Sequence, residues 1–295
     1  MRIHQETPAF RDFVHGTLTK PERMRGDQFE QIRDAHNDRD CLVSAEGFWN
    51  PILTPGENHA CTPFLIFSKK TIETDRVMLP GPTNEEHEVK AHELTQDQTD
   101  AYLCMVSLRE AARFVRELTT GCELHPSRMP IFYSGKRGFH VTIDHTLFRM
   151  KPAVTNRQVV AFYARQMRYL YQLETLNLEA YKKSHYMLRV VDSVNSETGR
   201  YCVQLSLEEA LKLDYPTLLV LSSKPRGVIY TPRKDEFTPG GFSDVWGEIE
   251  RQYERLDSLA KMRPIKPISK DIDLPPFYVP PGMLLKSCCF NYLGM

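Results

Sequence analysis

A short glycine-rich turn between two apolar runs is the feature that most constrains this fold. Residues 134–138 read Ser-Gly-Lys-Arg-Gly, after an apolar run over 129–133 and before an alternating run over 139–144. In the second run, Phe139, Val141 and Ile143 alternate with His140, Thr142 and Asp144. Because successive side chains of a strand point to opposite faces, the pattern predicts a β-hairpin with one apolar face and one polar face.

Capping signals followed by apolar residues at helical spacing predict several helices. Thr95-x-x-Gln98 opens one helix, which Gly121 closes, and Thr155-x-x-Gln158 opens another. Ser206-x-x-Glu209 caps a short helix, and apolar positions over 242–260 predict an amphipathic one near the end of the chain. Further strands are predicted over 62–67, 186–191 and 200–205.

The last part of the chain differs from the rest in its proline content. Residues 263–295 carry prolines at 264, 267, 275, 276, 280 and 281, with Phe277, Tyr278 and Leu284 between them. Because proline fixes φ and lacks a backbone donor, this composition predicts an extended tail. Its apolar side chains need a surface that covers them, either on the same domain or on a partner protein.

Charge and cysteine content limit the possible partners and compartments. The chain has 38 Lys and Arg against 38 Asp and Glu, so contacts with nucleic acid or phosphate must come from local clusters of cations. Its seven cysteines form no C-x-x-C pair, which favours a reducing, intracellular compartment over a disulfide framework or a zinc ribbon. No apolar run approaches membrane-spanning length, so we expect no membrane contact. The sequence does not distinguish nucleus from mitochondrion.

The turn at 134–138 has the chemistry of an anion site. Consecutive backbone N–H groups in a glycine-containing turn form an anion-binding concavity, and Lys136 and Arg137 add a point charge and a bidentate fork. The alternative is a plain hairpin turn whose cations face water. His140 also has two interpretations, as a structural histidine or as a contact to the bound group.

This string resembles the serine-glycine-basic-glycine-histidine motif of archaeo-eukaryotic primases, in particular the small catalytic subunit of DNA primase. A second stretch, HYMLRVVDSVNSETGR over 185–200, is similar to that family's segment ending in Ser-Val-His-x-x-Thr-Gly-Arg. The N-terminal FRDFVHGTL, with Arg25 and Phe29, resembles the family's first segment. The resemblance implies nucleotide or phosphate contacts at these positions: Ser134, Lys136, Arg137, His140, Arg189 and Arg25, with Asn195 in place of a histidine.

The resemblance also implies a fold. We expect an α+β domain over residues 1–262, an RRM-like and mostly antiparallel sheet with flanking helices, followed by the proline-rich tail 263–295. From Ser134 to Asn177 there are 43 residues (177 minus 134), which leaves no room for the helical insert usual in the replicative subunits. The family's zinc-binding cysteines are absent as well. The domain is therefore expected to be a reduced form of the family's scaffold.

Members of this family transfer phosphoryl groups with two divalent metals, held by an Asp-x-Asp strand and a third Asp. The aligned positions here are Ser68, Lys70 and Asn177, so all three carboxylates are missing. An ammonium about 4 Å from a divalent cation costs on the order of 8 kcal/mol at an effective dielectric constant of about 20. We therefore expect no metal and no other cofactor, and no catalytic residue at these degenerate positions.

A metal could still bind if carboxylates at other positions acted as its ligands. Nearby carboxylates are present at Glu73, Asp75, Asp144, Glu174 and Glu179, but none reproduces the Asp-x-Asp spacing on one strand face. Mg²⁺ or Mn²⁺ would be required only if such residues restored activity.

The preferred hypothesis is a primase-like pseudoenzyme that binds a nucleotide triphosphate, a 5′-phosphate or a nucleic-acid backbone, with protein partners in a larger nucleoprotein complex. In this hypothesis the ammonium of Lys70 offsets phosphate charge where the family uses metals. Two alternatives remain. The first is an active primase, a nucleotidyltransferase with displaced metal ligands. The second is a structural subunit with a relic cleft. The sequence does not choose DNA over RNA.

Overall fold

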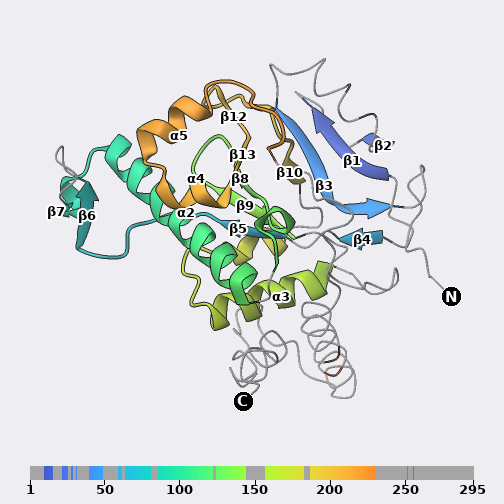
Figure 1. Cartoon of the computed structure of the whole chain (residues 1–295), viewed down its shortest axis with the longest axis horizontal. Coiled ribbons are helices and arrows are strands. Elements are labelled where there is room, and N and C mark those ends of the chain that lie inside the picture. The colour runs from blue at the N-terminus through green and yellow to red at the C-terminus, as the bar shows by residue number, and fades with distance from the viewer. Residues whose placement is uncertain are drawn as a thin grey trace.

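Small antiparallel sheets grouped around one long helix make up the part of the chain that the structure, a computed structural model, describes (Figure 1). The described residues are 10–15, 22–25, 28, 31, 40–48, 59–61, 64–80, 86–121, 124–143, 157–182, 187–229, 251 and 255. The predicted mixture of helices and antiparallel strands is confirmed. The Thr155 cap, most of the 242–260 helix and the tail 263–295 lie outside the described residues.

The elements follow one another as a mixture of short strands and helices. The strands are β1 Phe10–His15, β2 Glu22–Arg25, β3 Cys41–Phe48, β4 His59–Cys61, β5 Phe64–Phe67, β6 Arg76–Pro80, β7 Glu86–Lys90, β8 Ile131–Tyr133, β9 Phe139–Thr142, β10 Met187–Arg189, β11 Val194–Asn195, β12 Arg200–Tyr201 and β13 Val203–Leu205. The α-helices are α2 Gln96–Gly121, α3 Arg157–Leu170, α4 Leu207–Lys212 and α5 Tyr215–Leu221. The 3-10 turns are η1 Ala91–Glu93, η2 Pro126–Arg128 and η4 Leu178–Lys182.

The predicted hairpin forms the centre of a four-stranded sheet with the order β13-β8-β9-β5. Strands β8 and β9 pair with Tyr133 opposite Phe139, and the Ser134 N–H donates to the Gly138 carbonyl at 2.9 Å across the turn. Strand β5 pairs with β9, with Phe67 opposite Phe139. The apolar face read from the sequence is confirmed, because Phe139, Val141 and Ile143 are all fully buried, but His140 on the other face is buried as well.

A second sheet is built from the N-terminal strands, in the order β10-β3-β1-β2, with β4 also paired to β3 (Figure 1). Strand β10 joins the sheet from much later in the sequence, with Arg189 opposite Leu42. This pairing brings the 187–195 segment beside residues near the N-terminus, a contact that no local pattern in the sequence reveals.

The prediction of one strand over 200–205 is wrong, because the structure divides this segment between two sheets. Strand β12 pairs with β11 in a small hairpin, whereas β13 pairs with β8 in the central sheet. The break is at Cys202, whose N–H donates to the Ser193 carbonyl and whose carbonyl accepts from the Asp192 N–H, each at 2.8 Å. Asp192, with φ of 63°, lies in the turn that follows β10, and this turn is the partner of Cys202. These bonds to a distant turn outweigh the local strand pattern.

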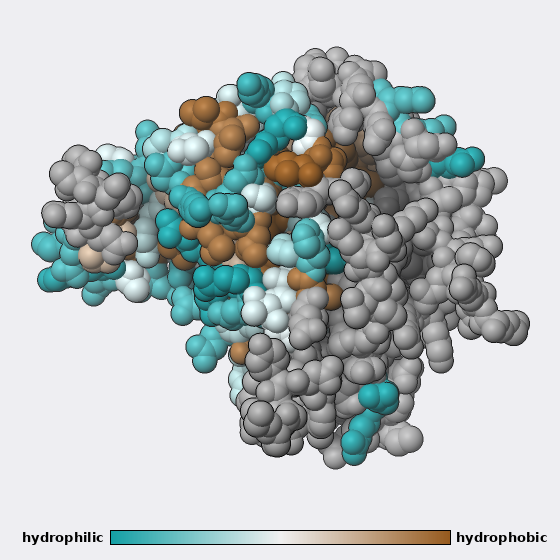
Figure 2. All heavy atoms as spheres, in the orientation of Figure 1, coloured by the Kyte–Doolittle hydropathy of each residue, from teal (hydrophilic) through white to brown (hydrophobic). Residues whose placement is uncertain are grey.

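The described surface is mainly hydrophilic in the view of Figure 2, with apolar patches around α4 and α5. The large apolar side chains that stay exposed include Val220 on α5 and Val228 in the segment that follows it. Among the helices of the described residues, none combines the length and apolar character needed to cross a membrane.

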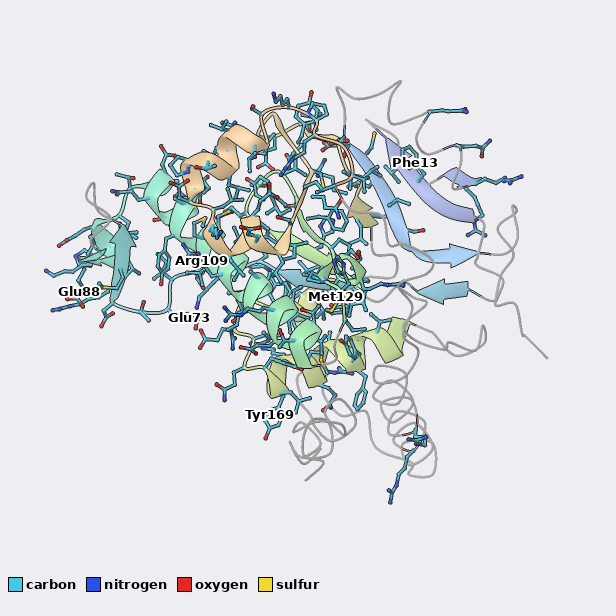
Figure 3. The ribbon with its side chains drawn as sticks, in the orientation of Figure 1. Phe13, Glu73, Glu88, Arg109, Met129 and Tyr169 are labelled. Carbon is cyan, nitrogen blue, oxygen red and sulfur yellow. The ribbon has the colours of Figure 1, made fainter. Side chains whose placement is uncertain are left out.

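Helix α2 packs against the central sheet and contacts β5 and β9, while α3 contacts β5 (Figure 1). The capping box predicted for α2 is present. The Thr95 hydroxyl accepts from the Gln98 N–H at 3.2 Å, and the Gln98 side chain accepts from the Thr95 N–H at 2.9 Å. The apolar positions Leu108, Ala111, Ala112, Val115 and Leu118 are all buried, as the helical spacing predicts. Figure 3 shows two other buried side chains, Phe13 on β1 and Met129 just before β8.

Candidate phosphate-binding site

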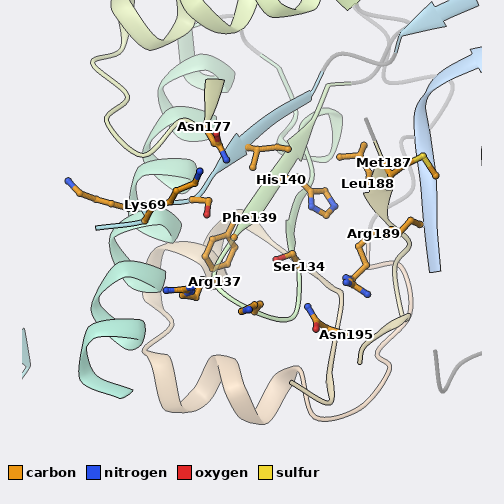
Figure 4. Close-up of a pocket in the computed structure, with 16 residues that line it drawn as sticks. Lys69, Ser134, Arg137, Phe139, His140, Asn177, Met187, Leu188, Arg189 and Asn195 are labelled. Carbon is orange, nitrogen blue, oxygen red and sulfur yellow. The ribbon is translucent and has the colours of Figure 1, made fainter. Parts of the chain in front are cut away.

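A cavity of about 560 Å³ lies where the 134–138 turn, the end of β5 and strand β10 meet (Figure 4). Nine of the ten residues predicted from the sequence line it: Ser68, Lys70, Ser134, Lys136, Arg137, His140, Asn177, Arg189 and Asn195. These residues lie far apart in the sequence, and the fold brings them together around one cavity. Whether they bind phosphate stays a prediction.

Two backbone hydrogen bonds carry Asn177 to the cavity. The Ser68 N–H donates to the Thr175 carbonyl at 2.8 Å, and the Asn177 N–H donates to the Ile66 carbonyl at 2.7 Å. The segment 175–177 therefore runs antiparallel beside the end of β5, with a bridge between Phe67 and Leu176. Ser68 and Asn177, two of the positions that the primase resemblance aligns with carboxylates, are thus neighbours in space.

Arg25 is the predicted contact that the structure does not bring to the cavity. It lies on β2, at the opposite edge of the N-terminal sheet from Arg189 on β10. Three strand spacings separate β2 from β10, a distance of roughly 14 Å between backbones. Arg25 does not line the cavity, and its backbone N–H donates to the Gln28 side chain at 3.0 Å.

Close packing against a neighbouring turn fixes the shape of the 134–138 turn. Gly135 has φ of 84°, and a Cβ added to it would lie 2.8 Å from the Arg200 carbonyl oxygen and 2.9 Å from the Asn195 Cβ. The Thr198 hydroxyl donates to the Gly135 carbonyl at 2.6 Å, and the Tyr133 hydroxyl donates to the Lys136 carbonyl at 2.7 Å. Only glycine fits at position 135.

The turn leaves a run of backbone donors without partners in the described part of the chain. The N–H groups of residues 135–138 make no hydrogen bond there, whereas that of Ser134 bonds across the turn. Successive N–H groups in a turn of this kind form a concavity with partial positive charge. The local geometry therefore has the donors that an anion requires.

The lining of the cavity is strongly basic, although the whole chain has no net charge. Five cations line it, and among the described residues no carboxylate does: Lys69, Lys70, Lys136, Arg137 and Arg189. Carboxylates from outside the lining hold four of these cations. Lys69 pairs with Glu174 at 3.5 Å, Arg137 with Asp100 at 3.1 Å, Lys136 with Glu197, and Arg189 with Asp40. Lys70 is exposed and has no ion-pair partner within the described residues.

Asp40 joins the N-terminal sheet to the turn at 196–199. Burial alone would raise the pKa of Asp40, but hydrogen bonds from Ser196 and Arg189 outweigh burial and lower the pKa below its ordinary value. Arg189 also donates to the Val194 carbonyl at 2.7 Å. Its guanidinium is therefore held from two sides at the wall of the cavity.

His140 is buried on the polar face of β9, with 6% of its surface exposed. It stacks on Phe132, with ring centroids 5.1 Å apart and an interplanar angle of 23°. Burial and the nearby Arg189 charge lower its pKa from 6.5 to about 4. At neutral pH the imidazole is uncharged, so it offers the cavity a hydrogen bond and no positive charge. The sequence predicted the face on which His140 lies but not its burial.

The residues present do not fit a pair of divalent metals. Ser68, Lys70 and Asn177 supply no carboxylate, and the Asn177 side-chain oxygen accepts from the Glu179 N–H at 3.1 Å. Of the carboxylates considered as displaced ligands, Glu174 pairs with Lys69, Glu73 and Asp75 line a different cavity, and position 144 lies outside the described residues. No group of three or more His, Cys, Asp or Glu side chains suited to a metal occurs among the described residues.

Sequence reasoning missed the carboxylates that position the cations. Asp40, Asp100 and Glu197 come from three distant segments, and nothing in the spacing of the sequence pairs them with Arg189, Arg137 and Lys136. Lys69 was also missed, because the family comparison directs attention to positions 68 and 70.

Comparisons with known proteins add little beyond the geometry. A scan against models of protein families finds no match, and a search of curated proteins finds none. Among solved structures, the polymerase domain of Mycobacterium tuberculosis ligase D in complex with DNA aligns with a TM-score of 0.34 and 15% identity, over 88% of this chain and 77% of that one. A likeness at that level carries no argument about the fold or the function of this chain.

The packing of Gly135 predicts a specific loss of stability. Gly135→Ala should lower the free energy of unfolding by at least about 2 kcal/mol, because it combines a left-handed φ with a backbone clash. Gly199→Ala is the control: its φ is 67° with no atom within 4 Å of the added Cβ, so it should lose only about 1 kcal/mol. Urea denaturation measures both. Equal losses in the two variants would show that the clash is relieved.

The buried His140 predicts a pH dependence of stability. Its pKa is about 4 in the folded protein and about 6.5 in an unfolded chain. Between these values the unfolded state binds more protons, so the free energy of unfolding should fall as the pH drops from about 6.5 to 4, by on the order of 3 kcal/mol. His140→Gln should flatten this part of the profile, whereas replacing the exposed His92 by Gln should not. The wild type and both variants have the same carboxylates, so the contribution of these groups to the pH profile cancels in the comparison. A wild-type profile that matches His140→Gln would contradict the prediction.

Proposed function

We propose that this protein binds phosphate groups of a nucleotide or of a 5′-phosphorylated nucleic-acid end in the cavity at 134–140, and does so without catalysing nucleotidyl transfer. The observation that carries the proposal is the lining of the cavity, which holds five cations and no described carboxylate. Phosphate is the biological anion that calls for such a concentration of charge and donors. The resemblance of the 134–140 and 185–200 segments to primase motifs supports the same ligand class.

The position of Lys70 supports binding without metals. In a two-metal site the ions neutralise phosphate oxygens, whereas this cavity offers a fixed ammonium at one of the aligned positions. Unlike the other four cations, Lys70 has no carboxylate partner among the described residues, so its charge is available to a ligand. An ammonium can offset the charge of phosphate, but it cannot act as a Lewis acid that lowers the pKa of an attacking hydroxyl.

A second candidate, a structural subunit with a relic cleft, is favoured by the ion pairs. Carboxylates already neutralise four of the five cations. However, Lys136 and Glu197 keep 38% and 66% of their side-chain surface exposed, and pairs of that kind contribute only about 0.2–1 kcal/mol. A dianionic phosphate group can therefore displace Glu197 at small cost, which makes binding the stronger proposal.

We also propose that the protein acts within a larger nucleoprotein assembly. The support is the sequence of the tail, whose apolar residues alternate with prolines over 263–295 and need a covering surface. The tail is outside the described residues, so this part of the proposal rests on sequence alone.

Phosphate binding is tested with a single-stranded oligonucleotide that carries a 5′-phosphate and a 3′-fluorophore, in buffer with chelator. The 5′-phosphorylated probe should bind more tightly than its 5′-hydroxyl counterpart, and binding should weaken with salt. Lys70→Ala and Lys136→Ala should each weaken it by about 1.5–3 kcal/mol, the range for one hydrogen bond to a charged group. Fluorescence anisotropy gives these affinities.

The matched control is Lys212→Ala, which removes the same charge from an exposed lysine paired with Glu208 on α4. It should leave the affinity almost unchanged. Binding that disappears in chelator, or that ignores the 5′-phosphate, would overturn metal-independent phosphate recognition at this cavity.

Absence of catalysis is tested separately. With Mg²⁺ or Mn²⁺, a template and all nucleotides, the protein should produce no more dinucleotide or extended primer than the double variant Lys136→Ala, Arg137→Ala, because no carboxylate is present at positions 68, 70 and 177. A denaturing gel with labelled primer and an active primase as positive control measures this. Template-dependent product that the double variant fails to make would establish the enzyme alternative.

A further inference from the structure

Two polar side chains of helix α2 lie among the buried residues of the core. Ser107 is fully buried, and Glu110 keeps only 11% of its side-chain surface exposed. The residues beside them on the helix, Leu108 and Ala111, belong to the apolar core. Burial of a carboxylate is costly unless donors satisfy it, so the groups that Glu110 binds indicate what this carboxylate does. Neither Ser107 nor Glu110 lines the proposed phosphate-binding cavity.

Glu110 holds the segment that brings Asn177 to the cavity. Its carboxylate accepts from the Glu174 N–H at 2.9 Å, from the Thr175 N–H at 2.7 Å and from the Thr175 hydroxyl at 2.5 Å. Arg113, one turn further along α2, lies 3.8 Å from the same carboxylate. Hydrogen bonds to an ionised acceptor are the stronger ones, and three of them here reach one short segment. The segment 174–177 is therefore fixed to α2.

Helix α2 also holds the end of β5, at two successive backbone groups. The Ser107 hydroxyl accepts from the Lys69 N–H at 3.0 Å. The preceding N–H, that of Ser68, donates at 2.8 Å to the carbonyl of Thr175, the residue that the buried carboxylate binds. One N–H is thus tied to α2 directly and the other through the segment 174–177. Figure 4 shows Lys69 beside α2 at this end of β5.

We infer that Ser107 and Glu110 are positioning residues for the ammonium of Lys70, an inference that rests on the proposed phosphate binding. Carboxylates hold the other four cations of the lining directly, whereas Lys70 has no ion-pair partner within the described residues. The backbone just before Lys70 therefore sets where its ammonium can lie. Because the attraction between charges falls with distance, the affinity that Lys70 contributes depends on the contacts that α2 makes with this backbone.

The competing interpretation is that Ser107 and Glu110 only stabilise the fold. Both interpretations predict a lower free energy of unfolding when the contacts are removed, so stability alone does not separate them. If the contacts only stabilise, variants that are still folded bind phosphate as tightly as wild type does. If they position Lys70, affinity falls in the folded variants, and it falls only while Lys70 is present. A double-mutant cycle between Glu110 and Lys70 measures that dependence.

The experiment is fluorescence anisotropy of the full chain with the 5′-phosphorylated oligonucleotide in chelator, at a temperature at which urea denaturation shows every variant to be folded. Glu110→Gln should weaken binding by about fivefold, but by less than about twofold in the Lys70→Ala background. Thr175→Val, a milder change that removes one donor to Glu110, should weaken binding by about threefold. Thr175→Ser keeps the hydroxyl and should bind as wild type does.

Glu117→Gln is the matched control, because Glu117 lies on the same helix and also pairs with Arg113 at 3.8 Å, but keeps 40% of its side-chain surface exposed. Its affinity should stay within about twofold of wild type. Unchanged affinity in Glu110→Gln and Thr175→Val, or equal losses with and without Lys70, would overturn the positioning role while leaving phosphate binding intact. If wild-type protein does not bind the 5′-phosphorylated probe, the proposed function fails, and this inference fails with it.

Discussion

The contact between two turns determines the shape of the candidate site. Gly135 approaches Arg200 and Asn195 too closely for a side chain, and Thr198 bonds to its carbonyl. The same second turn is joined through Ser196 to Asp40, which in turn holds Arg189. These contacts connect the central sheet to β10 at the edge of the N-terminal sheet. Because the cavity lies between the two sheets, with the 134–138 turn and β5 on one and β10 on the other, this chain of contacts holds Arg189 in place relative to the turn.

The carboxylates around the cavity have two different effects. Asp40, which accepts bonds from Arg189 and from both the N–H and the hydroxyl of Ser196, keeps Arg189 in one place. Glu197 is mostly exposed and holds Lys136 only weakly. Arg189 is therefore held in place on one side of the cavity, whereas on the other side the proposed phosphate ligand would have to displace only Glu197. The ion pairs also limit the repulsion among the cations of the lining.

The sequence predicted most of what local patterns determine. The 129–144 hairpin, the α2 capping box and the Ser206 box follow from short-range rules, and all three are present. The pairing of β10 with β3 and the division of 200–205 at Cys202 depend on contacts between distant segments. For the same reason, motif positions indicated nine lining residues, whereas their partners Asp40, Asp100 and Glu197 became visible only in three dimensions.

In the proposed function, Ser68, Lys70 and Asn177 stand at the positions that the primase resemblance aligns with carboxylates, and this difference affects what the cavity would do with a phosphate. A divalent ion brings two charges, exchanges with solvent, and lowers the pKa of a coordinated hydroxyl. The Lys70 ammonium brings one charge, is covalently fixed, and coordinates nothing. The proposed attraction for phosphate needs only charge and donors in position, and an ammonium supplies both. Two-metal phosphoryl transfer needs more, because the attacking and leaving oxygens both need a cation that can follow the charge as it develops. This difference is the physical reason for proposing that the cavity holds a phosphate rather than transfers it.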